Sequence, residues 1–121
     1  MMLNPMAAGL PEAQWTQYDP GSDFEDCEYR VEEMEFLGVK SRYIMIRGTI
    51  INYVSPSLHM PAGITVSFPL RDYPGSVIQC RRKSGNLEFW QASIYVNDAG
   101  DAIDFNTFGS GAKFLVFARV S

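Results

Sequence analysis

The sequence has few of the residues that build metal and redox sites. It contains two cysteines, Cys27 and Cys80, and one histidine, His59. Neither cysteine belongs to a Cys-x-x-Cys motif, and His59 has no cysteine or acidic residue close by in the chain, so we expect no zinc site and no histidine base. We also expect no other metal and no cofactor. The pattern favours two partly buried thiols and leaves open whether they pair.

Long hydrophobic runs and basic clusters are also missing. No apolar stretch approaches the ~20 residues of a membrane span, and the N-terminus lacks the basic and apolar blocks of a secretion signal. The largest basic cluster is Arg-Arg-Lys at 81–83, in a chain of net charge −4. Phosphate binding needs a net basic face, so we expect neither a nucleic-acid partner nor membrane insertion.

Catalytic motifs are absent as well. There is no Gly-x-Ser-x-Gly, no cysteine–histidine pair and no phosphate-binding glycine loop. The acidic residues between positions 23 and 35 fit the solvated face of a strand better than the paired carboxylates of a glycosidase. The segment Asn-Asp-Ala-Gly-Asp at 97–101 fails the spacing of a calcium loop and predicts a hairpin turn. The sequence therefore predicts a protein that is not an enzyme.

What the sequence does contain is a series of short apolar segments separated by turn residues. The chain has 121 residues, of which 46% are hydrophobic and 20% charged, which is typical of one globular domain. Residues 1–14 carry Pro5, Gly9 and Pro11 without a sustained period, so we expect an extended arm or connector there and a single domain over 15–121. No segment keeps a helical period. The pattern predicts an all-β antiparallel sandwich or jelly roll of about seven or eight strands.

The expected strands follow the apolar segments. They cover residues 27–39, 43–54, 64–70, 77–83, 87–96, 102–108 and 112–120. For 27–39 the glutamates leave a helix as the alternative. Turns are expected at 19–23, 71–76, 84–86, 97–101 and 109–111, and a loop at 55–63.

Two of these segments, 43–54 and 112–120, are apolar on both faces. A two-layer sandwich covers one face of each sheet, so such strands need a second cover, which a neighbouring subunit would supply. The alternative is that these are scattered exposed hydrophobic residues with arginines at a sheet rim. The predicted interface consists of the outward row of both strands: Tyr43, Met45, Arg47, Leu115, Phe117 and Arg119.

Four segments in this order carry a resemblance to a known family. They are Ile-Arg-Gly-Thr-Ile at 46–50, the strand and proline turn "ITVSFPLRDYP" at 64–74, the strand–turn–strand "ASIYVNDAGDAIDF" at 92–105, and the final "FLVFARVS" at 114–121. Together they resemble the C-terminal head domains of phage tail fibres and receptor-binding proteins, over about residues 27–121.

The resemblance implies a small jelly-roll-like head, related in shape to tumour-necrosis-factor trimers, in which three copies surround an axis. Such heads bind host-cell surface saccharides or proteins without chemistry, and the arm would join other virion proteins. The implied location is the virion, after assembly in the host cytoplasm. Family heads usually end a longer polypeptide, so we expect either a cut-out domain or a short virion protein. In the second case a capsid decoration, cement or tail-accessory role is the alternative.

Two loops are candidates for a ligand site. The first is 55–63 with His59, and the second is 71–76 with Arg71, Asp72 and Tyr73. Aromatic faces stack on sugar rings, while acidic and basic groups bond the hydroxyls, and recognition groups on rigid sandwiches lie on loops. The alternatives are an exposed loop histidine without a role and a rim turn held by Pro74.

Overall fold

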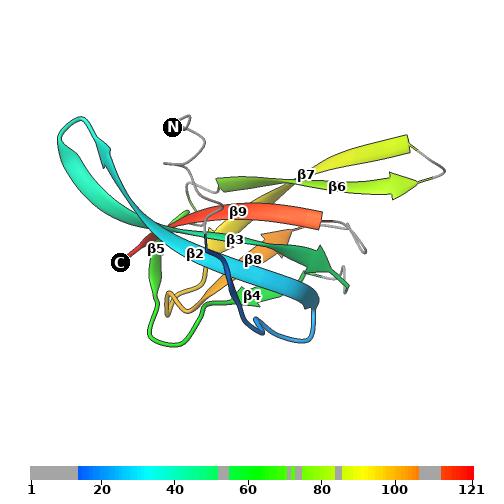
Figure 1. The fold of residues 1–121 in the computed structure, drawn as a ribbon, viewed down its shortest axis with the longest axis horizontal. Coiled ribbons are helices and arrows are strands. Elements are labelled where there is room, and N and C mark those ends of the chain that lie inside the picture. Colours follow the sequence, from blue (N-terminus) through cyan, green and yellow to red (C-terminus); the bar gives the residue numbers. More distant parts are fainter. Residues whose placement is uncertain (1–13, 52–54, 71, 73–74, 84–85, 107–112) are drawn as a thin grey trace, which may run out of the picture.

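The computed structural model describes residues 14–51, 55–70, 72, 75–83, 86–106 and 113–121 (Figure 1). Within these ranges it describes side chains except those of Phe36 and of residues 76–92. The arm predicted for residues 1–14 lies, apart from Gln14, outside the described residues.

Within the described ranges the chain forms nine strands and no helix, so the prediction of an all-β antiparallel fold is confirmed. The strands are β1 (Thr16–Gln17), β2 (Phe24–Phe36), β3 (Val39–Ile50), β4 (Ser57–His59), β5 (Val66–Phe68), β6 (Gly75–Lys83), β7 (Asn86–Val96), β8 (Ala102–Asn106) and β9 (Lys113–Val120). Three of them, β1, β4 and β5, have only two or three residues.

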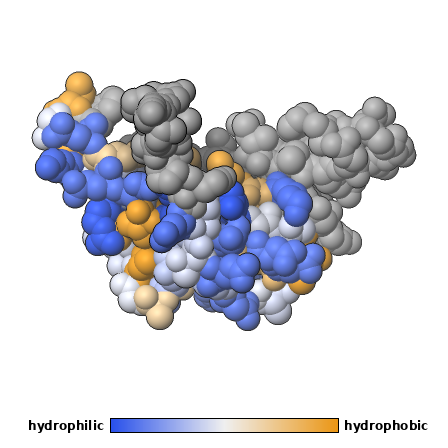
Figure 2. Space-filling model, in the orientation of Figure 1, coloured by the Kyte–Doolittle hydropathy of each residue, from blue (hydrophilic) through white to orange (hydrophobic). Residues whose placement is uncertain are grey.

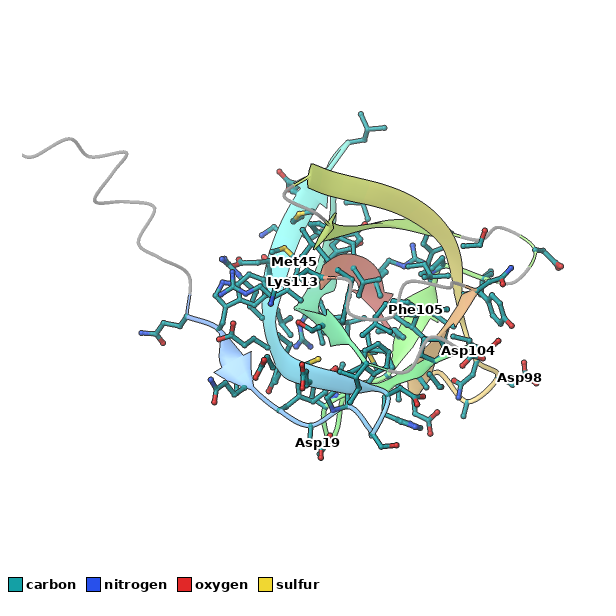
Figure 3. The ribbon with its side chains drawn as sticks, turned by 90° about the vertical axis from the view of Figure 1, so that its right-hand side faces the viewer. Asp19, Met45, Asp98, Asp104, Phe105 and Lys113 are labelled. Carbon is teal, nitrogen blue, oxygen red and sulfur yellow. The ribbon has the colours of Figure 1, made fainter. Side chains whose placement is uncertain are left out.

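The strands form one hydrogen-bonded path that folds back on itself. Its order is β1-β2-β3-β9-β6-β7-β8-β4, with β5 also beside β9, and every pairing is antiparallel. β9 passes from the first half to the second, because it pairs with β3 over residues 113–119 and with β6 over 113–115. The two halves face each other as the layers of a β-sandwich (Figures 1 and 3).

A cluster of three phenylalanines joins the two layers. Phe24 of β2, Phe105 of β8 and Phe114 of β9 meet edge to face, with ring centroids 5.4–5.6 Å apart. Figure 3 shows Phe105 inside the curled sheet. Inward-facing aliphatic residues surround the three rings: Ile44, Ile46, Ile50, Leu58, Val66, Ile94, Val96, Ile103 and Val116. The strands that carry these residues, β2–β5 and β7–β9, therefore each contribute buried side chains to one shared core.

The segment from 27 to 39, predicted as one strand, is instead the start of a hairpin. β2 ends at Phe36, β3 begins at Val39, and these two residues pair directly. Leu37 and Gly38, which connect them, have φ angles of 53° and 81°. Two successive positive φ angles are typical of a type I′ hairpin turn, and leucine is an unusual residue at its first central position. The prediction missed this turn because it lacks asparagine and aspartate.

The predicted loop at 55–63 also contains a strand. Ser57, Leu58 and His59 form β4, which pairs with β8 and buries Leu58 completely. The short connection before β2 closes the sandwich against this strand. The backbone N–H of His59 donates to the carbonyl of Pro20 (3.0 Å), and the Tyr18 hydroxyl donates to the carbonyl of His59 (3.0 Å). Burial raises the pKa of Tyr18 far above its usual range.

Candidate functional site: the outer face of β2, β3 and β9

The six predicted interface residues lie side by side on the outer face of β3 and β9. They are direct cross-strand partners: Tyr43 faces Arg119, Met45 faces Phe117, and Arg47 faces Leu115. The opposite sides of both strands carry buried residues, so these six side chains point away from the core. Leu115 and Phe117 are each 48% exposed. The prediction that both strands present apolar residues on their outward side is therefore confirmed, whereas their contact with a second subunit stays a prediction.

β2 extends this outer face with charged residues. Glu28 lies opposite Arg47, and Arg30 lies opposite Met45. The guanidinium of Arg47 binds Oε1 of Glu28 through both Nε (3.1 Å) and Nη2 (3.0 Å), and Arg30 forms an ion pair with Glu32. We use "outer face" below for the outward side of these three strands.

Arg47 also supports an aromatic ring that the sequence analysis did not single out. Its Cζ lies 3.9 Å from the centroid of the Trp15 ring, and the Cζ of Arg30 lies 5.8 Å from the same ring. A guanidinium at this distance is attracted to the negative face of the indole, in addition to its ion pair with Glu28. The arginine within an apolar strand thus holds Trp15 against the outer face. The one clue to this contact in the sequence was a tryptophan at the start of the domain predicted for 15–121.

The glycine after Arg47 makes room for a bulge in β2. Glu25 pairs with Thr49 and Glu28 with Arg47, so Asp26 and Cys27 together oppose Gly48. Asp26 has a φ of 54°, the left-handed conformation that turns the chain at such a bulge. A Cβ on Gly48 would lie 2.3 Å from the Cys27 sulfur. Any residue larger than glycine at position 48 would therefore force Cys27 to shift.

Cys27 is a buried free thiol. Burial is the main cause that raises its pKa from 9.0 to about 11. At neutral pH the protonated thiol therefore packs as a small apolar group rather than as a nucleophile. The side chain of Cys80 lies outside the described residues, so the prediction for that thiol stays a prediction.

A groove of about 580 Å³ lies on the outer face beside the bulge. Its lining combines apolar and charged side chains: Trp15, Asp26, Glu28, Met45, Arg47, Gly48, Lys113, Phe114 and Leu115. Met45 of β3 and Lys113 of β9, both labelled in Figure 3, line this groove from neighbouring strands. Lys113 Nζ also donates to the hydroxyl of Thr49 across the β3–β9 pair (3.2 Å). The groove has an apolar floor and a rim that carries charges of both signs.

The predicted ligand residues fall elsewhere in the fold. His59 ends β4 and is exposed, and Asp72 is an exposed turn residue between β5 and β6. Arg71 and Tyr73 lie outside the described residues. β7 and β8 separate β4 from β6 along the strand path. A saccharide site at these loops therefore stays a prediction.

The turn at 97–101 is formed as predicted. The side-chain carbonyl of Asn97 accepts from the backbone N–H of Asp101 (3.1 Å) and of Ala102 (3.3 Å), and Gly100 has a φ of 75°. Among the described residues, no three histidine, cysteine or acidic side chains are grouped to hold a metal ion. The described part of the chain also contains no helix long and apolar enough to cross a membrane.

Comparisons with protein-family models, with curated proteins and with solved structures found no match to this chain.

Proposed function

We propose that this chain is a non-enzymatic module of a bacteriophage particle, most specifically the receptor-binding head of a tail fibre, and that it works as a homotrimer. In this proposal the outer face of β3 and β9 lines the trimer axis. The N-terminal arm joins other virion proteins, and loops of the sandwich meet a host-surface saccharide. The resemblance in element order supplies the phage context.

One observation carries the self-association: Leu115 and Phe117 are half exposed beside Met45 on two adjacent central strands. Burying apolar surface contributes roughly 25 cal/mol per Å², so a continuous apolar row on a two-layer sandwich favours a partner that covers it. Arg47 and Arg119 flank the row. Arginine suits an interface because its planar guanidinium is weakly hydrated and forms paired hydrogen bonds.

Native mass spectrometry and light scattering of the purified chain test this proposal. We expect a mass of three chains at micromolar concentration. The variant Phe117→Asp should dissociate the trimer, because it places an unpaired charge in the apolar row.

Ile51→Asp is the matched control for that variant. Ile51 is 45% exposed, close to the 48% of Phe117, but it follows the end of β3 and does not belong to the apolar row of β3 and β9. We expect Ile51→Asp to stay trimeric. A wild-type chain that remained a soluble monomer at micromolar concentration would refute the proposal.

A capsid decoration, cement or tail-accessory protein is the second candidate. The observation that favours it is the breadth of the outer face, which spans three neighbouring strands and includes charges of both signs. A broad face of this kind suits permanent burial against another virion protein.

A further inference from the structure

The β2–β3 hairpin projects beyond the body of the sandwich. β9 accompanies β3 only as far as Tyr43, so residues 39–42 of β3 pair with β2 alone. The ribbon that continues past the sheet is visible at the upper left of Figure 1. At about 3.3 Å per residue, the part of β3 beyond Tyr43 reaches on the order of 13 Å outward. Two-stranded ribbons of this kind are marginally stable by themselves in water.

The tip of this hairpin is apolar and exposed. Leu37 is 89% exposed, Val39 is 64% exposed and Met34 is 43% exposed. Figure 2 shows hydrophobic atoms at the extremity where Figure 1 places the β2–β3 turn. Leucine in the left-handed region costs about 1–2 kcal/mol, and at this position asparagine or glycine would avoid the cost. A strained and exposed leucine at the apex of a projecting ribbon suits insertion into a partner.

The groove on the outer face offers a matching cavity on a second copy. Trp15, Met45 and Leu115 supply apolar walls, and the rim carries Asp26, Glu28, Arg47 and Lys113. Beside the hairpin tip, Glu35 and Lys40 stand opposite each other. On the rim, Glu28 and Arg47 already bind each other. The remaining rim charges, Asp26 and Lys113, are opposite in sign to Lys40 and Glu35 of the ribbon.

We propose that the tip of the β2–β3 hairpin inserts into the outer-face groove of a neighbouring copy of this chain. The contact is heterologous, because the surface that inserts differs from the surface that receives it. Head-to-tail contacts of this type close into a ring when the rotation between copies allows it. The inference rests on the proposed self-association and specifies how one subunit grips the next.

The test uses one variant at each surface. Leu37→Asp alters the tip, and Leu115→Asp alters the groove. Leu37 is almost fully exposed and Leu115 half exposed, so both variants should keep the circular dichroism spectrum of the wild type. Each alone should lose the trimer and give the mass of one chain. The control Leu37→Met keeps an apolar tip and should stay trimeric.

Mixing the two variants makes the test specific. The Leu115→Asp chain keeps an intact tip and the Leu37→Asp chain keeps an intact groove, so the mixture should form a complex of one copy of each. In addition, a mixture of Leu37→Cys and Leu115→Cys should give a disulfide-linked dimer under mild oxidation that neither variant gives alone.

Three outcomes would overturn the hairpin contact. They are a trimeric Leu37→Asp chain, a mixture that stays monomeric, and absence of the specific cross-link. If Phe117→Asp still dissociated the trimer in that case, the proposed function would stand while this inference fell. A wild-type chain that is monomeric would refute both the proposed function and this inference.

Discussion

Gly48 shows how a single residue determines the geometry of the outer face. It lies where Asp26 and Cys27 bulge out of β2, and its missing side chain lets the Cys27 sulfur turn inward. The bulge restores the alternation of β2, so that Glu28 returns to the outer face opposite Arg47. The sequence pattern Ile-Arg-Gly-Thr-Ile thus has two physical causes. Arg47 binds Glu28 and stacks on Trp15 at the outer face, and Gly48 leaves room for the Cys27 sulfur on the inner face.

Gly48→Ala should destabilise the fold by about 1–3 kcal/mol, because the new Cβ would overlap the Cys27 sulfur. Urea unfolding measures the loss. The double variant Cys27→Ala/Gly48→Ala should recover part of it, since the sulfur is gone, and Cys27→Ala alone supplies the third corner of the cycle. If the two changes lowered the free energy of unfolding additively, overlap with the Cys27 sulfur would not be the cause of the loss in Gly48→Ala.

The raised pKa of Cys27 predicts a dependence of stability on pH. The folded chain keeps the thiol protonated up to about pH 11, whereas the unfolded chain loses that proton near pH 9.0. The folded state therefore binds more protons between these values, and its stability falls as pH rises from 9 toward 11, by at most about 1.4 kcal/mol per unit. Urea unfolding of wild type and Cys27→Ala at pH 8 and pH 10 measures the difference. If the free energy of unfolding changed equally with pH in the wild type and in Cys27→Ala, Cys27 would be excluded as the cause of the pH dependence.

At the scale of elements, the outer face could be predicted from the sequence while the hairpin could not. Alternation in β9 assigns Leu115 and Phe117 to one side and Phe114 and Val116 to the other, because side chains in a strand alternate strictly. The register between two strands does not follow from the sequence of either strand alone. The direct pairing of Met45 with Phe117 was therefore seen only in the structure. The turn at Leu37 escaped because its first residue contradicts the usual chemistry of a type I′ turn.

Other parts of the site were hidden for similar reasons. Trp15 reaches the outer face through its stacking on Arg47, a contact between residues 32 positions apart. The bulge at Asp26 has no glycine of its own, and its partner Gly48 lies on the other strand. β4 was missed because it has only three residues, of which Leu58 alone is apolar, and prolines lie close on both sides of it.

Leu37→Asn should stabilise the isolated subunit by roughly 1 kcal/mol, because asparagine tolerates the left-handed conformation. The measurement is thermal or urea unfolding in a Phe117→Asp background, which removes assembly from the comparison. Leu37→Ala is the control, since it deletes the same apolar surface and keeps the backbone cost. In the otherwise wild-type chain, the same Leu37→Asn change should weaken the trimer. An asparagine variant that lost stability in the monomer would contradict the assignment of strain to Leu37.

At the scale of the whole molecule, the two proposed roles differ in which surface remains free. A receptor-binding head buries its outer face within the trimer and leaves loops such as those at His59 and Asp72 open to the host cell. A decoration or cement protein covers its broad face with another virion protein. Both roles use the same apolar residues, so the oligomeric state of the isolated chain does not separate them. Measurements on whole particles separate the two roles, because attachment to cells and stability of the particle can be measured independently.

If the receptor-binding proposal holds, phage particles that lack this chain should adsorb poorly to host cells while keeping normal resistance to heat. The reason is that a head contributes contacts to the host and none to the shell, and three heads per fibre multiply weak individual contacts into strong attachment. Particles that carry Asp72→Ala and Tyr73→Ala should also adsorb poorly, with the trimer intact by native mass spectrometry. Ser22→Ala, at an exposed residue of another turn, is the matched control. Normal adsorption together with heat-sensitive particles would reject the receptor-binding role and support the decoration role, because a cement protein stabilises the shell through the face that a head would bury between its own subunits.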